Sequence, residues 1–465
     1  MFYASLLRHI GCTAWAHEAA AIVGGDDLDM LRTFEAVDPG NKRAVVGRVF
    51  ELGRDLPAGR RVRAMVGALV APRARAHLAA AQCAQAEALA GDLGLGEGVV
   101  TALAQMYERH DGAGVPHGLR GEAITIPGRL LSAAQQIEAL HRRSGRTGTI
   151  DELRRRRGRM VHPAIAGAAV AEADALWAML EAPAAEALLA AEPEPWLEVP
   201  VAQLDTIALA FARFADLKTP SSVGHSPATA QLATAAARLA GCPPGELEVM
   251  TRAALLHDLG SVTVANGVWE HRGPLGAAAW EQVRLHAYHT ERILARSPAL
   301  APFAAVAGAH HERPDGSGYH RGARAEAVSR LARLLAAADS LVALRADRPH
   351  RTARSEAAAM RELERDAREG RLCRDAVAVV LEASGQPRRR AALPASLTDR
   401  EAEVLGHLAR GLGTKEIAVA LGIAPRTVKH HIEHIYDKTG VSTRAGAALF
   451  AARHDLVAPD RPIDP

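Results

Sequence analysis

Histidine and aspartate side chains that can bind metal ions recur in an ordered set between residues 225 and 339. His257 and Asp258 are adjacent at the end of an apolar helical run, where the imidazole can bind one metal ion and the carboxylate can bridge two. Asp339 lies inside the apolar segment RLLAAADSLVAL, where an unpaired carboxylate is costly unless a cation accompanies it. The complete predicted ligand set is His225, His257, Asp258, His286, His310, His311 and Asp339.

This set predicts two divalent transition metal ions, an arrangement that suits hydrolysis of a phosphate ester. The chain contains 21 histidines, so a solvated helix-end pair is the alternative explanation for any single His–Asp neighbour. The order of the whole set favours the metal site. His289 follows His286 by nearly one helical turn, and we expect it to support the site or to face solvent.

Helices must position these residues. The chain has 465 residues, too many for one ordinary core, and its hydrophobic fraction of 48% comes mostly from Ala, Leu and Val, with only 4% aromatic residues. This composition predicts an all-α protein. Two stretches rich in Pro and charge, Pro183–Pro200 and Gly385–Ser396, separate predicted domains at residues 1–182, 200–385 and 397–457.

Charge, cysteine and hydropathy patterns limit the possible partners and cellular location of the protein. The formal charge is +3, with 56 basic and 53 acidic residues, so any DNA contact must be local. The four cysteines lie far apart and form no C-x-x-C pair, which argues against disulfides and a zinc ribbon. No uncharged apolar run reaches about eighteen residues. We therefore expect a soluble cytoplasmic protein without a membrane partner.

The first two predicted domains are related to each other. The segment YERHDGAGVPHGLRG at 107–121 repeats the plan of HERPDGSGYHRG at 311–322, and SLLRHIG at 5–11 resembles ALLHDLG at 254–260. In the first copy Arg8 and His9, Met106 and Tyr107, and Gln135 stand where the second has its ligands. The first copy is therefore predicted to be a structural partner that holds no such metals, with nucleotide sensing as the open alternative.

The ordered ligands and the segment HHERPDGSGYHRG resemble the HD superfamily of metal-dependent phosphohydrolases, and within it the HD-GYP branch, over residues 200–385. The resemblance implies that the seven residues bind two ions, iron or manganese, with Asp258 shared between them and Asp339 as an open second candidate for sharing, and that Asp258 and Tyr319 serve catalysis. It implies hydrolysis of cyclic di-GMP. Three positions depart from the family pattern: Ser261 replaces a phosphate-facing Lys, His320 replaces Pro, and Ser221 replaces a Glu that binds a third metal in some members.

A second pattern occupies residues 397–457. Thr398 with Glu401 predicts a capping box, Thr414 is expected to cap the next helix, Gly422 makes a turn, and Pro425 begins a helix that runs to about Lys438. The stretch resembles the LuxR/FixJ-type helix-turn-helix family, which implies double-stranded DNA as partner and a homodimer paired through Thr443–Arg453. The predicted DNA-binding residues are Lys415, Arg426, Thr427, Lys429, His430 and His434.

Lys and Arg nearly balance Asp and Glu in this stretch, so the DNA prediction rests on pattern, and a helical interaction module is the alternative. Together the parts predict a DNA-binding transcriptional regulator with a phosphohydrolase or nucleotide-sensing domain that takes a phosphorylated nucleotide. Two versions stay open. In one, occupancy of the site alters DNA binding; in the other, an active cyclic di-GMP phosphodiesterase is localised by its DNA-binding domain.

Overall fold

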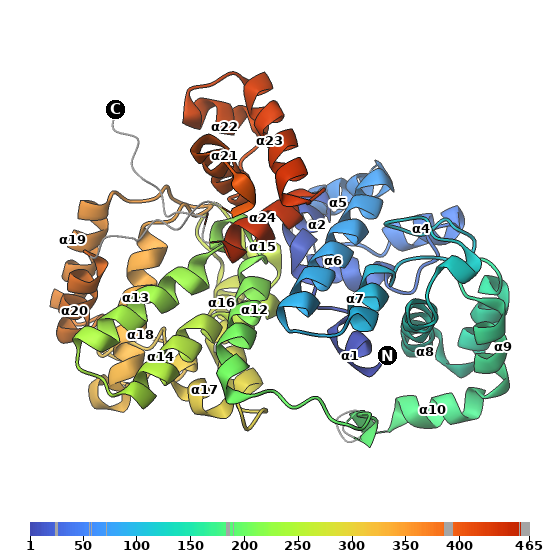
Figure 1. The fold of residues 1–465 in the computed structure, drawn as a ribbon, viewed down its shortest axis with the longest axis horizontal. Helices are drawn as coiled ribbons and strands as arrows, with labels where there is room; N and C mark the ends of the chain where they lie inside the picture. The colour runs from blue at the N-terminus through green and yellow to red at the C-terminus, as the bar shows by residue number, and fades with distance from the viewer. Residues whose placement is uncertain are drawn as a thin grey trace. The chain divides into compact units, whose positions relative to one another are not determined.

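The computed structural model describes residues 1–23, 27–54, 56, 58–70, 72–182, 187, 188, 190–385, 394–454 and 456. Throughout these residues the regular structure is helical, which confirms the all-α prediction, and extended pairing is limited to isolated bridges such as Asp111 with Arg120. The chain divides into two compact units, Met1–Pro200 and Val201–Pro465 (Figure 1). Parts of both predicted linkers, at 183–186, 189 and 386–393, and residues 455 and 457 of the third predicted domain lie outside the described residues.

The described part of the first unit is built from helices. Its elements are α1 Phe2–Leu7, η1 Cys12–Trp15, α2 Ala16–Val23, α3 Asp27–Phe34, α4 Lys42–Val49, α5 Ala58–Val70, α6 Pro72–Asp92, α7 Glu97–Ala104, η2 Gly121–Ala123, α8 Ile126–Arg156, α9 Pro163–Ala171 and α10 Ala173–Glu181. Helix α6 packs against α7 and η1, burying Leu89 and Leu103. Helix α8 is interrupted at Gly145, whose φ of 66° suits glycine.

The second unit begins with a helical bundle. Its elements are η3 Val201–Gln203, α12 Leu204–Asp216, η4 Pro220–Ser222, α13 His225–Leu239, α14 Pro244–Leu256, η5 Leu259–Thr263, α15 Asn266–Trp269, α16 Ala277–Leu294, α17 Ala301–Gly308, η6 Ala325–Ala327, α18 Arg330–Leu344, α19 Glu356–Arg368 and α20 Arg374–Ser384. Helix α13 packs against α14, α18 and α20 through buried alanines. Because small side chains let helix axes approach closely, the ligand-bearing helices come together.

The turn after α17 is held by a buried acid. Glu312, 2% exposed, accepts hydrogen bonds from the backbone N–H of Arg321 (2.7 Å) and Ala323 (2.7 Å), which closes the Gly-rich loop. Gly318 is required inside this loop, because a Cβ there would lie 2.3 Å from the backbone nitrogen of Arg313. The closed loop fixes Tyr319 beside the end of α17.

The unit ends in four further helices after η7 Pro394–Ser396: α21 Asp399–Ala409, α22 Thr414–Leu421, α23 Pro425–Thr439 and α24 Arg444–Arg453. The predicted capping box of Thr398 and Glu401 is present, and Gly422 adopts a φ of 62°. The expectation that Thr414 caps α22 is wrong. Gly413 is the cap residue, and its N–H donates to the Glu416 carboxylate at 2.6 Å, which leaves Thr414 as the first helical residue.

No single helix among the described residues is long and apolar enough to cross a membrane; α9 and α10 meet the length and hydropathy criteria only as a pair bent by 76°.

Candidate metal centre and DNA-reading face

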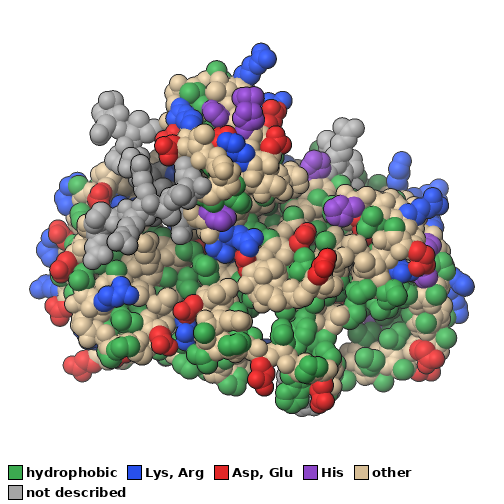
Figure 2. Space-filling view, in the orientation of Figure 1, with side chains coloured by type: hydrophobic (Ala, Val, Ile, Leu, Met, Phe, Trp, Pro, Cys, Tyr) green, Lys and Arg blue, Asp and Glu red, His purple; other side chains and the backbone are tan. Residues whose placement is uncertain are grey.

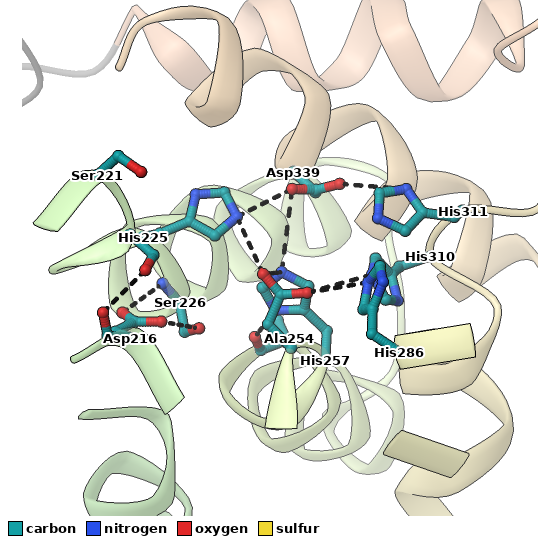
Figure 3. A network of polar contacts seen from close by, with 12 residues as sticks. Asp216, Ser221, His225, Ser226, Ala254, His257, His286, His310, His311 and Asp339 are labelled. Atoms are coloured by element: carbon teal, nitrogen blue, oxygen red, sulfur yellow. Dashed lines mark hydrogen bonds and ion pairs between the residues drawn. The ribbon is translucent and has the colours of Figure 1, made fainter. Parts of the chain in front are cut away.

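The seven predicted ligands come from five places in the second unit and converge (Figure 3). His225 is the first residue of α13, and His257 follows α14 directly, with Asp258 next. His286 lies in the middle of α16, and His310 and His311 follow α17. Asp339 lies in α18 and is 5% exposed, as its apolar surroundings predict. Helix ends supply most of the set, so the packing of these ends determines the geometry of the site.

The donor atoms form two overlapping groups. One group contains Asp258 with three histidines, and the other contains Asp258 with two; within each, the donor atoms lie within 4.8 Å of one another. Asp258 is the shared member, with one carboxylate oxygen 3.3 Å from His286 Nε2 and the other 3.5 Å from His257 Nε2. A carboxylate that faces two donor groups is placed to bridge two cations. The groups are Asp258, His286, His310 and His311, and His225, His257 and Asp258.

Asp339 closes the second group. Its Oδ1 lies 3.0 Å from His225 Nε2 and 3.9 Å from His257 Nε2, while its Oδ2 lies 4.0 Å from His311 Nδ1. Asp339 therefore contacts His225 and His257 through one carboxylate oxygen and His311 through the other, as the dashed lines in Figure 3 show.

Three imidazoles are oriented by their own helices. The Nδ1 of His257 contacts the carbonyl of Ala254 at 2.7 Å, that of His310 contacts the carbonyl of Ala307 at 2.6 Å, and that of His286 contacts the carbonyl of Val283. Since a carbonyl only accepts, each Nδ1 is the protonated donor and each Nε2 carries a lone pair. All three Nε2 atoms are thus prepared as metal ligands, with the ring held in place by the backbone.

These lone pairs need a cation. The Nε2 atoms of His286 and His310 lie 3.2 Å apart, although both are acceptors once their Nδ1 atoms donate to carbonyls. His257 Nε2 is buried and has no hydrogen-bond partner among the described residues. A buried acceptor without a partner costs free energy, and a cation bound by Nε2 would remove that cost. The residues therefore fit a pair of divalent transition metals.

Charge within the cluster keeps its two carboxylates ionised. Burial alone would raise the pKa of Asp258, but the charge of His257 and the close contacts with His286 and His310 bring it well below its ordinary value. Burial also opposes ionisation of Asp339, yet its hydrogen bond with His225 and the positive charge of neighbouring histidines lower the pKa of that carboxyl. Burial lowers the pKa of His311 well below its usual range. Ionised carboxylates and neutral imidazoles are the forms that bind metals.

Asp216 secures the first ligand helix. Its carboxylate accepts hydrogen bonds from the backbone N–H (2.9 Å) and the hydroxyl (2.6 Å) of Ser226, the residue after His225. Burial raises the pKa of Asp216 to about 6, while His225 and the bonds from Ser226 act against that rise. The sequence did not single out Asp216. Its position at the end of α12, next to the start of α13, is the only signal available.

Tyr319 lies beside the site, with its ring 4.7 Å from that of His311, and burial raises the pKa of its hydroxyl. Two arginines that sequence reasoning missed lie nearby. The Arg284 guanidinium is 5.8 Å from the centre of the Tyr319 ring, and the Nη1 of Arg313 is buried without a hydrogen-bond partner among the described residues. Arg313 stands inside the HHERPDG segment, which was the available signal.

The three departures from the family pattern are visible in the structure. Ser261 uses its backbone, donating to the Asp258 carbonyl (2.9 Å) and accepting from Trp269 Nε1 (3.2 Å), and it adds no charge. His320 turns to Glu291, with Nε2 3.3 Å from a carboxylate oxygen. Ser221 stands apart from the ligand cluster in Figure 3 and offers no carboxylate. His289 is half-buried and belongs to neither donor group.

The first unit repeats the scaffold without the ligands. Glu108 accepts hydrogen bonds from the N–H of His117 (2.7 Å) and Leu119 (2.9 Å), as Glu312 does in the second copy. A Cβ on Gly11 would lie 2.1 Å from the Gln82 carbonyl oxygen, and one on Gly260 would lie 2.0 Å from that of His286. Gln82 therefore occupies the place of His286, a substitution that the repeat alone did not reveal.

The predicted DNA-binding side chains lie on one exposed face of α22 and α23. All six side chains are exposed. Val428 and Ile435 of α23, by contrast, are buried against α21 and α24. Figure 2 shows Lys, Arg and His side chains interspersed with Asp and Glu on this part of the surface. The rings of His430 and His434 are 4.1 Å apart. The six residues are Lys415, Arg426, Thr427, Lys429, His430 and His434.

A model of the HD domain family matches residues 76–164 and 210–374, which is more than half of the chain. The chain belongs to the HD domain family. A model described as bacterial regulatory proteins, luxR family, matches residues 395–451. The chain thus joins an HD phosphodiesterase-like domain to a LuxR-type DNA-binding domain, as the sequence predicted.

Relatives match the two parts separately. The 3′3′-cGAMP-specific phosphodiesterase 3 of Vibrio cholerae is 28% identical over 358 residues, covering 76% of this chain and 78% of that protein. The probable transcriptional regulatory protein NarL of Mycobacterium tuberculosis is 45% identical over 75 residues, covering 16% of this chain and 35% of its own length. The crystal structure of a cyclic GMP-AMP-specific phosphodiesterase of V. cholerae aligns with 82% of this chain and 93% of that one, at a TM-score of 0.49 and 23% identity.

Proposed function

We propose that this protein is a DNA-binding regulator whose second HD copy holds two divalent transition metal ions, iron or manganese, and hydrolyses a phosphodiester bond of a cyclic dinucleotide. The observation that carries the proposal is the pair of donor groups that share Asp258. Nitrogen donors mixed with carboxylate oxygens suit both metals. The V. cholerae relative, named as cGAMP-specific, supports a cyclic dinucleotide as the substrate class.

When bound, the metal ions would supply Lewis-acid charge and a water made nucleophilic at neutral pH. The chain's own residues do the rest. Nε2 atoms fixed by Nδ1–carbonyl bonds would hold the ions, and Asp258, which belongs to both donor groups, would be a ligand common to them. Arg284 and Arg313, beside Tyr319, supply the fixed positive charge that a phosphate needs, in the absence of a lysine at Ser261. Tyr319, beside the site, orients the ligand.

Hydrolysis is tested directly with the full chain. Purified protein loaded with Mn²⁺ is incubated separately with 3′,3′-cGAMP and with cyclic di-GMP, and linear products are separated by chromatography. We expect product from wild type and none from Asp339→Asn, because the amide removes a charge that faces both donor groups. His271→Ala, a change at an exposed histidine outside both groups, is the control. No product from metal-loaded wild type with either dinucleotide would refute the hydrolysis proposal.

A second candidate function is sensing, in which occupancy of the site alters DNA binding without turnover. Helix α12 favours it, because it touches both parts of the second unit. Its Asp216 holds the start of α13 through Ser226, and its Arg213 donates from Nη2 to the carbonyl of Arg453, at the end of α24, at 2.8 Å. A shift of α13, which carries the ligand His225, would therefore be transmitted through α12 to α24.

DNA affinity separates the two candidates. Under sensing, 3′,3′-cGAMP changes the affinity of wild type for its operator, the change is lost in Asp339→Asn, and no linear product forms. Under hydrolysis, product forms and the affinity is the same with and without nucleotide. An affinity change that survives in Asp339→Asn would place the sensing event elsewhere.

For the C-terminal module we propose that α23 enters the major groove of double-stranded DNA, with Arg426, Lys429 and His430 reaching base edges or phosphates and Lys415, Thr427 and His434 flanking them. We propose that α24 pairs two chains into a homodimer on a near-palindromic site, and that the protein works in the cytoplasm, where DNA is accessible. Retention of genomic fragments by the full-length protein tests this. Equal retention by wild type and by Arg426→Ala, Lys429→Ala would contradict it.

A further inference from the structure

The first copy, which lacks the metal-binding residues, keeps a polar cluster at the place that corresponds to the metal site of the second copy. Gln82 stands in the place of His286, and its Oε1 accepts hydrogen bonds from Tyr107 Oη (2.7 Å) and Trp15 Nε1 (3.1 Å). Its Nε2 lies 3.1 Å from Cys12 Sγ. The glutamine is thereby satisfied by neutral groups alone, so the interior half of this cluster is complete without a ligand.

Arg8 is the exception. It stands where the second copy has His257, and like that residue it directly follows a helix, in this case α1. The Arg8 side chain is half-buried, and its Nε is buried with no hydrogen-bond partner among the described residues. Loss of water lowers the pKa of Arg8 below its ordinary value, and Tyr107 is the first of the groups that oppose this effect. A guanidinium in this setting is costly unless an anion pairs with it.

Neighbouring carboxylates are engaged elsewhere. Glu35 and Glu138 both act on Arg8 at a distance, but each pairs with Arg142, whose Nη2 lies 2.5 Å from the Glu35 carboxylate and whose Nε lies 3.4 Å from that of Glu138. His9, in the place of Asp258, replaces an acidic side chain with an imidazole and is exposed to solvent. The outer half of the cluster is therefore reachable from solvent and lacks a carboxylate partner for Arg8.

We propose that the first copy binds an anionic, phosphate-bearing ligand at the position that corresponds to the metal centre, with the Arg8 guanidinium replacing the positive charge that metal ions supply in the second copy. His9 offers a further N–H donor at the rim. A metal-binding residue is thus replaced by a side chain that is itself positively charged. A phosphate would therefore still find positive charge at this position, although the residues needed for hydrolysis are lost. The first copy then serves as a binding site, separate from the proposed catalytic or sensing site.

The test uses the full chain with His257→Ala and Asp258→Ala, which removes metal-dependent binding in the second copy, and the changes caused by Arg8 variants then report on the first copy. Inorganic phosphate and 3′,3′-cGAMP are titrated separately by calorimetry. We expect Arg8→Gln to weaken binding at least tenfold, Arg8→Lys to weaken it less, and Arg63→Gln, a matched change at an exposed arginine of α5, to leave it unchanged. Binding of phosphate alone identifies a free-phosphate site, and tighter binding of the dinucleotide identifies a nucleotide site.

Thermal unfolding distinguishes a loss of binding from a folding defect in the Arg8 variants. Arg8→Met removes the unpartnered charge, so its melting temperature without phosphate should equal or exceed that of the parent chain, while the upward shift that phosphate causes in the parent should be lost. A lower melting temperature with an intact phosphate shift would show that Arg8 is structural and overturn the proposal. So would the absence of binding to either probe. Neither result bears on the metal content or activity of the second copy, which is measured on a chain with His257 and Asp258 intact.

Discussion

Thr290 joins the segment that carries the His–Asp pair to helix α16, and its removal should loosen that segment. The hydroxyl of Thr290 is fully buried, accepts from the Gly260 N–H at 2.8 Å and donates to the His257 carbonyl at 2.8 Å. Thr290→Val keeps the shape of the side chain and removes both bonds. The Gly260 N–H would then be buried without a partner, because the packed α16 backbone leaves no room for water beside Gly260.

The expected cost follows from these two bonds. A net hydrogen bond contributes about 1 kcal/mol, and an orphaned buried donor costs about 1–3 kcal/mol, so the local opening free energy around residues 257–263 should fall by about 2–3 kcal/mol. At about 1.4 kcal/mol per factor of ten, amide exchange in this segment should accelerate by about 30- to 150-fold. Metal affinity should fall as well, because His257 and Asp258 lose their anchor.

Hydrogen–deuterium exchange with peptide resolution measures the effect in the full chain. Thr229→Val is the matched control: Thr229 is equally buried in α13, but its hydroxyl has no hydrogen-bond partner among the described residues. Its replacement should leave exchange unchanged or slower. If Thr290→Val and Thr229→Val exchanged alike at residues 257–263, the role assigned to the Thr290 bonds would be wrong.

Three further predictions test other parts of the structure. Gly260→Ala should lose at least half of the bound metal, since a Cβ there would lie 2.0 Å from the His286 carbonyl oxygen, whereas Gly245→Ala, with open space around its Cβ, should keep it; elemental analysis of both proteins decides the matter. Glu401 has a pKa lowered to about 2 from 4.5: burial opposes the shift, and the Lys438 ion pair and the Thr398 bonds outweigh it. Its stabilising contribution, about 1–2 kcal/mol after screening, is therefore present above pH 4.5 and lost as the pH falls toward 2. Glu401→Gln should make the free energy of unfolding, measured by urea titration, less dependent on pH. The same pH dependence in wild type and variant would refute the role assigned to Glu401. Lys429→Ala should weaken operator binding about tenfold at moderate salt and lower the salt-dependence slope by about 1, unlike Lys42→Ala at an exposed lysine of the first unit; equal slopes in anisotropy titrations would remove Lys429 from the DNA interface.

Sequence reasoning selected residues that converge in the structure, because their types are rare in apolar surroundings. Asp339 inside an alanine- and leucine-rich helix and the adjacent pair at His257 stand out against the hydrophobic pattern, and the Gly-rich turn repeats in both copies. The orientation of the imidazoles could not be predicted in this way. It depends on carbonyls three residues earlier, such as Ala254 and Ala307, whose availability follows from how each helix ends.

Contacts between distant segments were also beyond reach. Gln82 was not recognised as the counterpart of His286, because the close approach of Gly11 to its backbone appears only in three dimensions. The cap of α22 was placed one residue late, since Thr414 has the more typical capping side chain, whereas the backbone geometry and the reach of Glu416 select Gly413. A tertiary contact decided the first case, and local backbone geometry decided the second.

The metal content of the purified full-length chain tests the central claim most directly. Elemental analysis should find two equivalents of iron or manganese per chain in wild type and in His271→Ala, and fewer than one in the double variant His257→Ala, Asp258→Ala, because that variant removes the shared carboxylate and a buried imidazole together. Equal metal content in wild type and the double variant would contradict the two-cation centre.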